Sequence, residues 1–293
     1  MKEDLNMGKN TKNNTGIVKS ILARTLIYIE LIIVAIIVIY PLLWVVGSSL
    51  NPVNGIARAS MIPKGATLAN YIRLFTKTKY LTWYGNTGYV AILTMVFAIF
   101  INTLTAFIFA RFRFKGRKPT LLFMMILQTF PSFLSLTALY MVALNFNMLN
   151  NLNMLIIIYV AGTIPANIWL VRGYLLNLPK SLDEAAYIDG ATKLQVFTKV
   201  ILPLSVPIIT YIALVAFMAP WMDFLLPRLL INKTEVRTLA IGLYDWLDFT
   251  SSNADFTAFC AGSVLIAVPI ATLYMIFQRF IITGIASGAN KGE

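Results

Sequence analysis

Long runs without a charged residue dominate the chain, and short polar or basic segments separate them. A helix needs about 20 mostly apolar residues to cross the hydrocarbon core of a membrane. The longest run, 119–171, is too long for one crossing and divides at the polar stretch 145–153. The pattern therefore predicts six spans, at Leu31–Ser49, from about Thr87 to Ala110, two within 119–171, Ser205–Leu226 and Phe256–Phe277.

The lysine and arginine residues between these spans predict the orientation of the chain. Cytoplasmic loops of membrane proteins carry the excess of these cations. The side that holds both termini has 16 of them, including the cluster 111–118, whereas the other side has 8. Both termini are therefore predicted to be cytoplasmic, although the outside loop 51–86 carries five cations. The net charge of +12 fits basic residues near anionic lipid and needs no nucleic acid.

The segment 181–207 bears polar residues between two apolar runs and has the pattern of a folded element. Ser181, followed three residues later by Glu184, predicts a capping box at the start of a helix. Gly190 is expected to end that helix in a turn. A second helix, limited by Pro203 and Pro207, is expected to bury one face, formed by Leu194, Phe197, Val200 and Ile201. From these residues alone, an ordinary amphipathic connector on the membrane surface is the alternative.

Composition supports a polytopic membrane protein. Hydrophobic residues make up 58% of the 293 residues, the mean hydropathy is +0.76, and only 12% are charged. The absence of histidine excludes histidine-based catalysis, metal binding and proton relays. The single cysteine, Cys260, lies in an apolar run and is expected to act as a small hydrophobe. No phosphate-binding loop of the G-x-x-x-x-G-K-[ST] type occurs, so an ATP-driven process would need another polypeptide.

Few ionisable residues approach the predicted spans. Asp223 lies near the outer end of the fifth span and is expected to face protein or a water-filled path, with Arg228 as its candidate ion-pair partner. The alternative is an interfacial charge outside the hydrocarbon core. Only Glu30 and Asp223 come close to the membrane, which argues against an ion-coupled secondary transporter. The lack of a carboxylate cluster argues against a membrane-embedded enzyme.

Several motifs resemble the permeases of ABC importers. Glu184-Ala185-Ala186, Gly190 and Ile201-Leu202-Pro203 match their EAA loop. Beyond that loop, most of the chain from Leu31 onward is similar to the second membrane subunit of maltose/maltodextrin importers, in the carbohydrate-uptake branch. The stretches that carry this resemblance are PLLWVVGSSLNP, ARFRFKGRK, LQTFPSFLSLTALY, WLVRGYL, TLAIGLYDWL and SGANKG.

The resemblance implies an all-α membrane protein with six transmembrane helices, the type I ABC-importer permease fold and cytoplasmic termini. It implies a transmembrane permease domain (25–284) with a cytoplasmic coupling loop at 178–203 and a cytoplasmic C-terminal tail (285–293). The polar, basic residues 1–24 are not part of the match and are expected to form a cytoplasmic N-terminal segment. That loop would dock a separate cytoplasmic ATPase, which would use ATP and Mg, and the chain itself would hold no cofactor or metal. The residues assigned to the loop's coupling role are Glu184, Ala185, Ala186, Asp189, Gly190, Ile201, Leu202 and Pro203.

The family also implies a homologous second permease and an extracellular sugar-binding protein as partners. The substrate would be an oligosaccharide, with maltodextrins first and galacto-oligosaccharides as an alternative. A loop between the last two spans, 231–255, would reach into the binding protein and help to release sugar. Its candidate residues are Tyr244, Asp245, Trp246 and Phe249, since aromatic faces and carboxylates suit a sugar. An aromatic belt at the membrane interface is the alternative for them. Asp223 is a possible pathway residue.

Overall fold

A computed structural model describes the backbone of residues 3–248 and 254–289, and within these ranges the chain forms helices and no β-strand. The longer helices are α1 (Glu3–Ser49), α3 (Tyr80–Arg111), α6 (Leu152–Leu176), α10 (Val206–Met222) and α13 (Phe256–Ala289). The shorter ones are α2 (Ala69–Lys77), α4 (Arg117–Thr129), α5 (Leu136–Asn145), α7 (Ser181–Ile188), α8 (Lys193–Gln195), α9 (Leu202–Leu204), α11 (Leu225–Leu230) and α12 (Leu239–Leu247). Three 3-10 turns, at Ile56–Arg58, Ser132–Ser135 and Thr234–Val236, and a π-helical turn at Val196–Ile201 complete the described elements.

Four of these helices are long and apolar enough to cross a membrane unaided. They are α1 from Leu22, α3, α6 and α13 to Phe280. Two further pairs qualify only as bent spans, one joining Arg117–Thr129 to Phe133–Asn145 at 94° and one joining Lys193–Leu204 to Val206–Met222 at 81°. The described residues thus hold four spans, or six if each bent pair is one crossing, so the six-span count stays a prediction.

Proline explains both bends. Pro131 separates α4 from α5, and Pro207 stands in the first turn of α10, directly after the break at Ser205. A proline lacks the backbone donor that would continue the preceding helix. The third span, predicted as a single run, is therefore broken. The break at Ser205 falls at the predicted start of the fifth span, whose helix α10 is continuous and ends at Met222 instead of Leu226.

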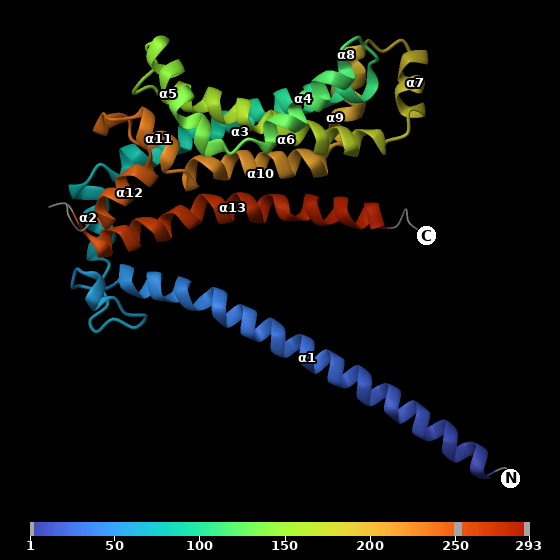
Figure 1. The fold of residues 1–293 in the computed structure, drawn as a ribbon. Coiled ribbons are helices and arrows are strands. Elements are labelled where there is room, and N and C mark those ends of the chain that lie inside the picture. Colours follow the sequence, from blue (N-terminus) through green and yellow to red (C-terminus); the bar gives the residue numbers. More distant parts are fainter. Residues whose placement is uncertain (1–2, 249–253, 290–293) are drawn as a thin grey trace.

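Four of the five long helices run roughly alongside one another, and they are α3, α6, α10 and α13 (Figure 1). The fifth, α1, diverges from them. In the body, α3 packs against α6 and α10, and α13 packs against α10. Helix α1 meets the body through α13, near the C-terminal end of α1. None of the residues in its apolar 18-residue window is buried.

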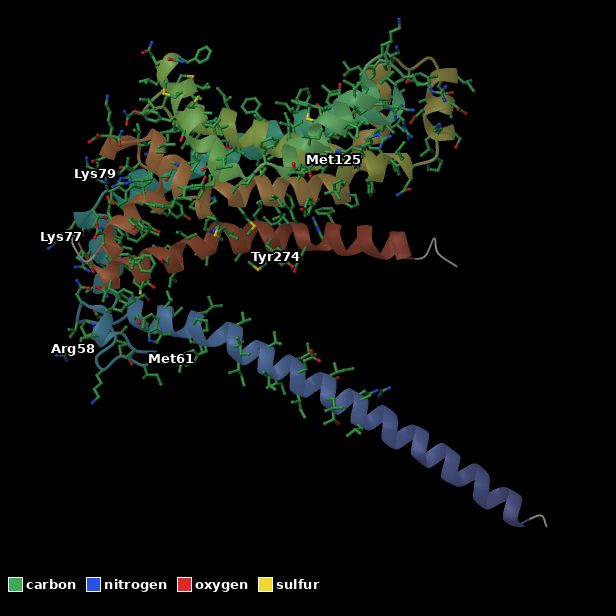
Figure 2. All side chains as sticks on the ribbon, viewed as in Figure 1. Arg58, Met61, Lys77, Lys79, Met125 and Tyr274 are labelled. Atoms are coloured by element: carbon green, nitrogen blue, oxygen red, sulfur yellow. The ribbon has the colours of Figure 1, made fainter. Side chains whose placement is uncertain are left out.

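The molecule has two distinct ends, here called the α7 end and the α12 end. The α7 end holds α7, α8 and the C-terminal end of α13, whereas α2, α11 and α12 lie at the opposite end (Figure 1). Figure 2 places Arg58, Lys77 and Lys79 at the α12 end. Each end has its own buried hydrophobic cluster, one around Trp83 and Trp246 and the other around Phe107 and Phe197.

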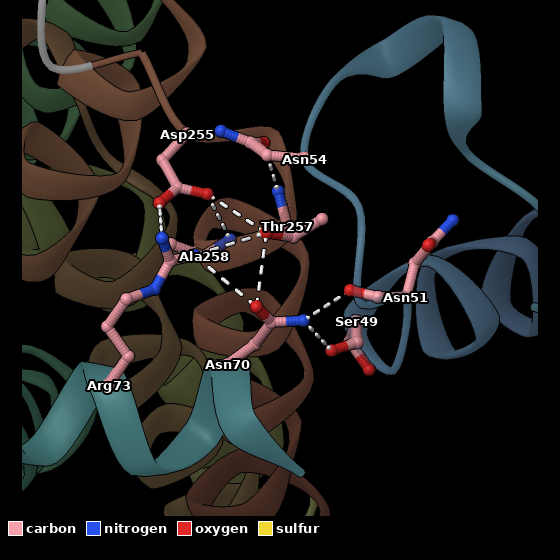
Figure 3. Close-up of polar contacts among 8 residues, drawn as sticks. All are labelled: Ser49, Asn51, Asn54, Asn70, Arg73, Asp255, Thr257 and Ala258. Atoms are coloured by element: carbon pink, nitrogen blue, oxygen red, sulfur yellow. Dashed lines mark hydrogen bonds and ion pairs between the residues drawn. The ribbon is translucent and has the colours of Figure 1, made fainter. Parts of the chain in front are cut away.

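A polar network fastens the end of α1 to the body (Figure 3). The Asn70 amide on α2 donates to the carbonyls of Ser49 and Asn51, at 2.9 and 2.8 Å. Arg73, one turn later on α2, forms a 2.6 Å ion pair with Asp255, just before α13. Thr257 donates to the side-chain oxygen of Asn70 at 3.3 Å. Helix α2 thus joins the first long helix to the last one.

Candidate functional site

The helix predicted from Ser181 exists, but the predicted capping box does not. Helix α7 begins at Ser181, its N-cap is Lys180, and no side chain caps it. The expectation for Ser181 and Glu184 is wrong because the chain is already helical at Lys180 (φ −67°, ψ −23°). Backbone bonds from Asp183 and Glu184 to the Lys180 carbonyl satisfy the first turn. Glu184 is exposed, so its carboxylate is free to meet a partner.

Gly190 ends α7 as predicted. Its φ is +81°, in the left-handed region that favours glycine, and no atom lies near the position of a Cβ. The Gly190 N–H donates to the Tyr187 carbonyl, and the Ala191 N–H donates to the Ala186 carbonyl at 2.9 Å. These two bonds form a Schellman motif, which closes the end of α7.

The second helix of the loop starts at a capping box that the sequence reasoning missed. The Thr192 hydroxyl accepts from the Gln195 N–H, and the Gln195 side chain accepts from the Thr192 N–H. The turn that follows is π-helical, and it buries Phe197 and Ile201 as expected. Leu194, predicted on the same face, is 66% exposed, because it precedes the wider turn that rotates the inner face toward residues 196, 197 and 201.

The outer face of the candidate coupling loop is largely exposed. Glu184, Ala185, Asp189 and Gly190 are exposed, and Ala186 is half-buried. Ile188 is the most exposed large apolar side chain of the loop, at 86%, and the sequence reasoning did not single it out. An apolar residue beside small ones and carboxylates forms a surface that another protein can approach closely.

The three residues Ile201, Leu202 and Pro203 lie at the other end of the loop. Ile201 is fully buried, Leu202 is half-buried and Pro203 is exposed. Ile201 therefore anchors the loop in the body and does not itself face a partner. The same buried cluster contains Phe107, Val171 and Phe197, and the Phe107 and Phe197 rings lie 5.1 Å apart.

A buried ion pair that the sequence reasoning did not predict holds α7 to α3. Arg111 Nε lies 2.7 Å from Asp183 Oδ2, and the two side chains are 6% and 10% exposed. Arg111 also donates to the Leu178 carbonyl at 3.3 Å. Burial raises the pKa of Asp183 and Arg111 opposes that rise, while the neighbouring Glu184 adds to it. A partial signal existed, because Arg111 lies in the basic motif and Asp183 precedes the EAA residues.

At the α12 end, the candidate sugar-release residues do not form one surface. Trp246 is 7% exposed, and its ring packs against Tyr80 and Trp83 at 6.4 and 5.7 Å. The expectation that it offers an aromatic face to a partner is wrong, because it faces the core side of α12. Tyr244 is 49% exposed and stacks on Phe224 at 4.2 Å. Phe249 lies outside the described residues.

The carboxylates near α12 also have partners within the chain. Asp245 lies 2.6 Å from Arg237 and 3.6 Å from Arg228. Asp223 was expected to pair with Arg228, and this is wrong. Its Oδ2 accepts from the Tyr159 hydroxyl at 2.9 Å, and its Oδ1 accepts from the Leu226 N–H at 3.3 Å. This second bond holds the carboxylate at the start of α11.

Asp223 faces protein, as predicted, and it also lines an open cleft of about 370 Å³. Tyr159 on α6 and Ser135, in the break between α4 and α5, line the same cleft. The cleft therefore offers a carboxylate and hydroxyl groups beside apolar walls. Among the residues that the structure describes, no group of three or more acidic, cysteine or histidine side chains could hold a metal ion.

Four long apolar helices, two bent apolar helix pairs and a folded loop with an exposed outer face are the features of a membrane-embedded protein. The sequence matches the family described as binding-protein-dependent transport system inner membrane component over residues 102–287, and the chain belongs to this family of inner-membrane proteins.

Transport permeases from other bacteria match almost the whole chain. The galactooligosaccharides transport system permease protein GanQ of Bacillus subtilis is 38% identical over 268 residues, which are 90% of this chain and 94% of GanQ. The maltodextrin transport system permease protein MalD of Streptococcus pneumoniae is 38% identical over 280 residues, or 96% and 100% of the two chains.

One solved structure shares the fold. A chain of a bacterial ABC transporter involved in the import of the acidic polysaccharide alginate superimposes with a TM-score of 0.75. The superposition covers 92% of this chain and 97% of the transporter chain, and the two sequences are 21% identical. At that identity the likeness shows a common fold only.

Proposed function

We propose that this chain is a permease subunit of an ATP-binding-cassette importer that brings oligosaccharides across the plasma membrane. The observation that carries the proposal is the coupling loop, whose inner face is buried in the body and whose outer face is exposed. Such a loop is an attachment point for a second protein. Since no ATP-binding motif was found in the chain, a separate ATPase dimer is the partner that supplies energy, using ATP and Mg.

The other partners follow from the family. A binding-protein-dependent system requires an extracellular binding protein, and a homologous second permease completes the pathway. Both termini, the cluster 111–118 and the coupling loop are then cytoplasmic, and the six spans place α12 outside. The domain limits stay at 1–24, 25–284 and 285–293. In this arrangement Asp223 lines the pathway and Tyr244 faces the binding protein, whereas Asp245 and Trp246 hold α12 in place. Phe249 keeps its proposed place in the sugar-release loop.

Maltodextrins are the proposed substrate, and galacto-oligosaccharides are the second candidate. The first rests on the motifs quoted above and on relatives such as MalD, and the second rests on GanQ. Uptake of labelled maltotriose and of a labelled galacto-oligosaccharide by a strain that lacks this chain, with and without the restored gene, separates them. Restoration of neither uptake would contradict the oligosaccharide assignment.

The loop assignment is tested by Gly190→Val. At φ +81° a β-branched residue is strained, so the turn after α7 changes shape. The surface on which the ATPase docks is then altered. We expect the variant to reach the membrane but to co-purify with at least tenfold less ATPase.

The matched control is Gly65→Val. Gly65 has φ +76° and open space around it, like Gly190, but it lies in the loop between α1 and α2 at the α12 end. Equal ATPase recovery with Gly190→Val and wild type, or equal loss with both variants, would show that this loop does not dock the ATPase.

A further inference from the structure

Helix α3 connects the coupling loop to α12. It runs without a break from Tyr80 to Arg111, and its 32 residues correspond to roughly 48 Å at 1.5 Å per residue. The other long helices, α1, α6, α10 and α13, each contain an internal proline, whereas residues 80–111 contain none. Since proline is one of the main causes of a sharp kink, α3 lacks a kink site that each of the other long helices has.

At the α12 end, polar bonds fasten α3 to the segment that leads into α12. The Thr87 hydroxyl accepts from the Leu239 N–H at 2.8 Å, at the first residue of α12. The Asn86 amide donates to the carbonyls of Glu235 and Arg237, both at 2.9 Å. The Trp83 indole donates to the Thr234 carbonyl at 3.0 Å. Backbone atoms are the partners in each bond, so the position of the segment itself is fixed.

At the α7 end, Arg111 is the last residue of α3 and Asp183 lies in the first turn of α7. Their ion pair has little exposure and a short contact of 2.7 Å. Two further atoms, Arg111 Nη1 and Asp183 Oδ1, are buried without a hydrogen-bond partner within the described residues. A buried ion pair that leaves such atoms unsatisfied adds little to stability, because desolvation opposes the attraction between the charges. What it does provide is a defined orientation of α7 relative to α3.

We propose that the Arg111–Asp183 pair is the joint through which movement of the coupling loop reaches α3 and, through α3, the outer helix α12. Both residues are positioning residues, since neither faces the exposed surface of α7. The proposal rests on the proposed function, because it needs an ATPase docked on that surface. It also relates the basic motif at 110–118 to the EAA residues, because Arg111 and Asp183 bring these two segments together.

The test uses the complete complex in proteoliposomes, with the second permease, the ATPase dimer and the binding protein. Asp183→Asn removes the charge at nearly constant size, and Arg111→Gln removes the other one. We expect both variants to retain bound ATPase but to transport at least tenfold less sugar per ATP hydrolysed. The charge-swapped double variant, Arg111→Asp with Asp183→Arg, restores at least part of that ratio. Arg113→Gln is the matched control, because Arg113 is exposed and two residues away, and it leaves the ratio unchanged.

The outcomes separate the possible failures. A normal ratio of sugar to ATP in Asp183→Asn overturns the proposal. Failure of the single variants and of the swapped pair to assemble overturns it too, because the pair would then serve folding alone. A wild-type complex that binds no ATPase or transports no oligosaccharide contradicts the proposed function instead, before any variant is compared.

Discussion

Replacing Trp246 should destabilise the protein far more than replacing Tyr244, two residues earlier on the same helix. Trp246 is 7% exposed and contacts two aromatic rings, whereas Tyr244 is 49% exposed and, among the described residues, stacks on the single ring of Phe224. A buried aromatic residue cut to alanine costs about 3–5 kcal/mol. Loss of a half-exposed stacked ring costs about 1 kcal/mol, the typical worth of an aromatic pair. For a chain of this size, the unfolding midpoints fall by roughly 10 °C and 3 °C.

The chain contains its own reporter for this measurement. Cys260 is the single cysteine and is fully buried. A thiol-reactive fluorophore therefore reports unfolding during a temperature ramp, provided that the partner subunits lack cysteine. Trp246→Phe is the control that keeps an aromatic ring in place, and it should lose less stability than Trp246→Ala. Equal midpoints for Trp246→Ala and Tyr244→Ala, or an unchanged midpoint with lost sugar release in Trp246→Ala, would refute the assignment of Trp246 to the core.

Three further predictions concern topology, sugar release and pH. In a Cys260→Ala background, Lys115→Cys and Lys193→Cys should resist an impermeant thiol reagent in intact cells while Lys64→Cys reacts, and outside labelling of Lys193→Cys would contradict the topology. Combining Tyr244→Ala with deletion of Thr250–Asn253 should leave sugar on the binding protein longer in the nucleotide-trapped complex but not in the resting one, and equal retention in the trapped state would oppose a role in release. The hydrogen bond from Lys79 lowers the pKa of Glu235 below its usual 4.5. The pair should therefore contribute its full stability at pH values above 4.5, and it should lose this contribution as the pH falls through the lowered pKa of Glu235 in the folded protein. Unfolding midpoints of wild type and Glu235→Gln should therefore converge in acid, and a constant difference would contradict the pair's role.

The apolar spans could be predicted from the sequence because lipid selects for composition over about 20 residues, whatever the neighbouring helices are. The left-handed turn at Gly190 was predictable for a similar local reason. The capping box was not, since Ser181 and Glu184 have the same spacing as Thr192 and Gln195, and only the backbone at Lys180 separates the two cases. Local patterns therefore locate elements better than they locate the bonds at their ends.

Pairing between distant residues was out of reach of the sequence reasoning. Asp223 has Arg228 five residues away, yet its partner is Tyr159, 64 residues earlier. Trp246 and Tyr244 differ little in sequence context, and their different exposure follows from the turn of α12 against Trp83. In each case the deciding contact comes from another helix, and one sequence does not contain its position.

The attachment of α1 has a consequence for the order of events during synthesis. The Thr257 N–H donates to the Asn54 side chain across 203 residues of sequence, and the Trp44 ring lies 5.6 Å from Phe256. At about 5–20 residues per second, the ribosome needs about 10–40 s after Asn54 to make these partners. For that time α1 lacks its attachment to α13. A chain that stops before Phe256 never acquires that attachment, so truncated products should differ from the full protein at their first helix as well as at their last.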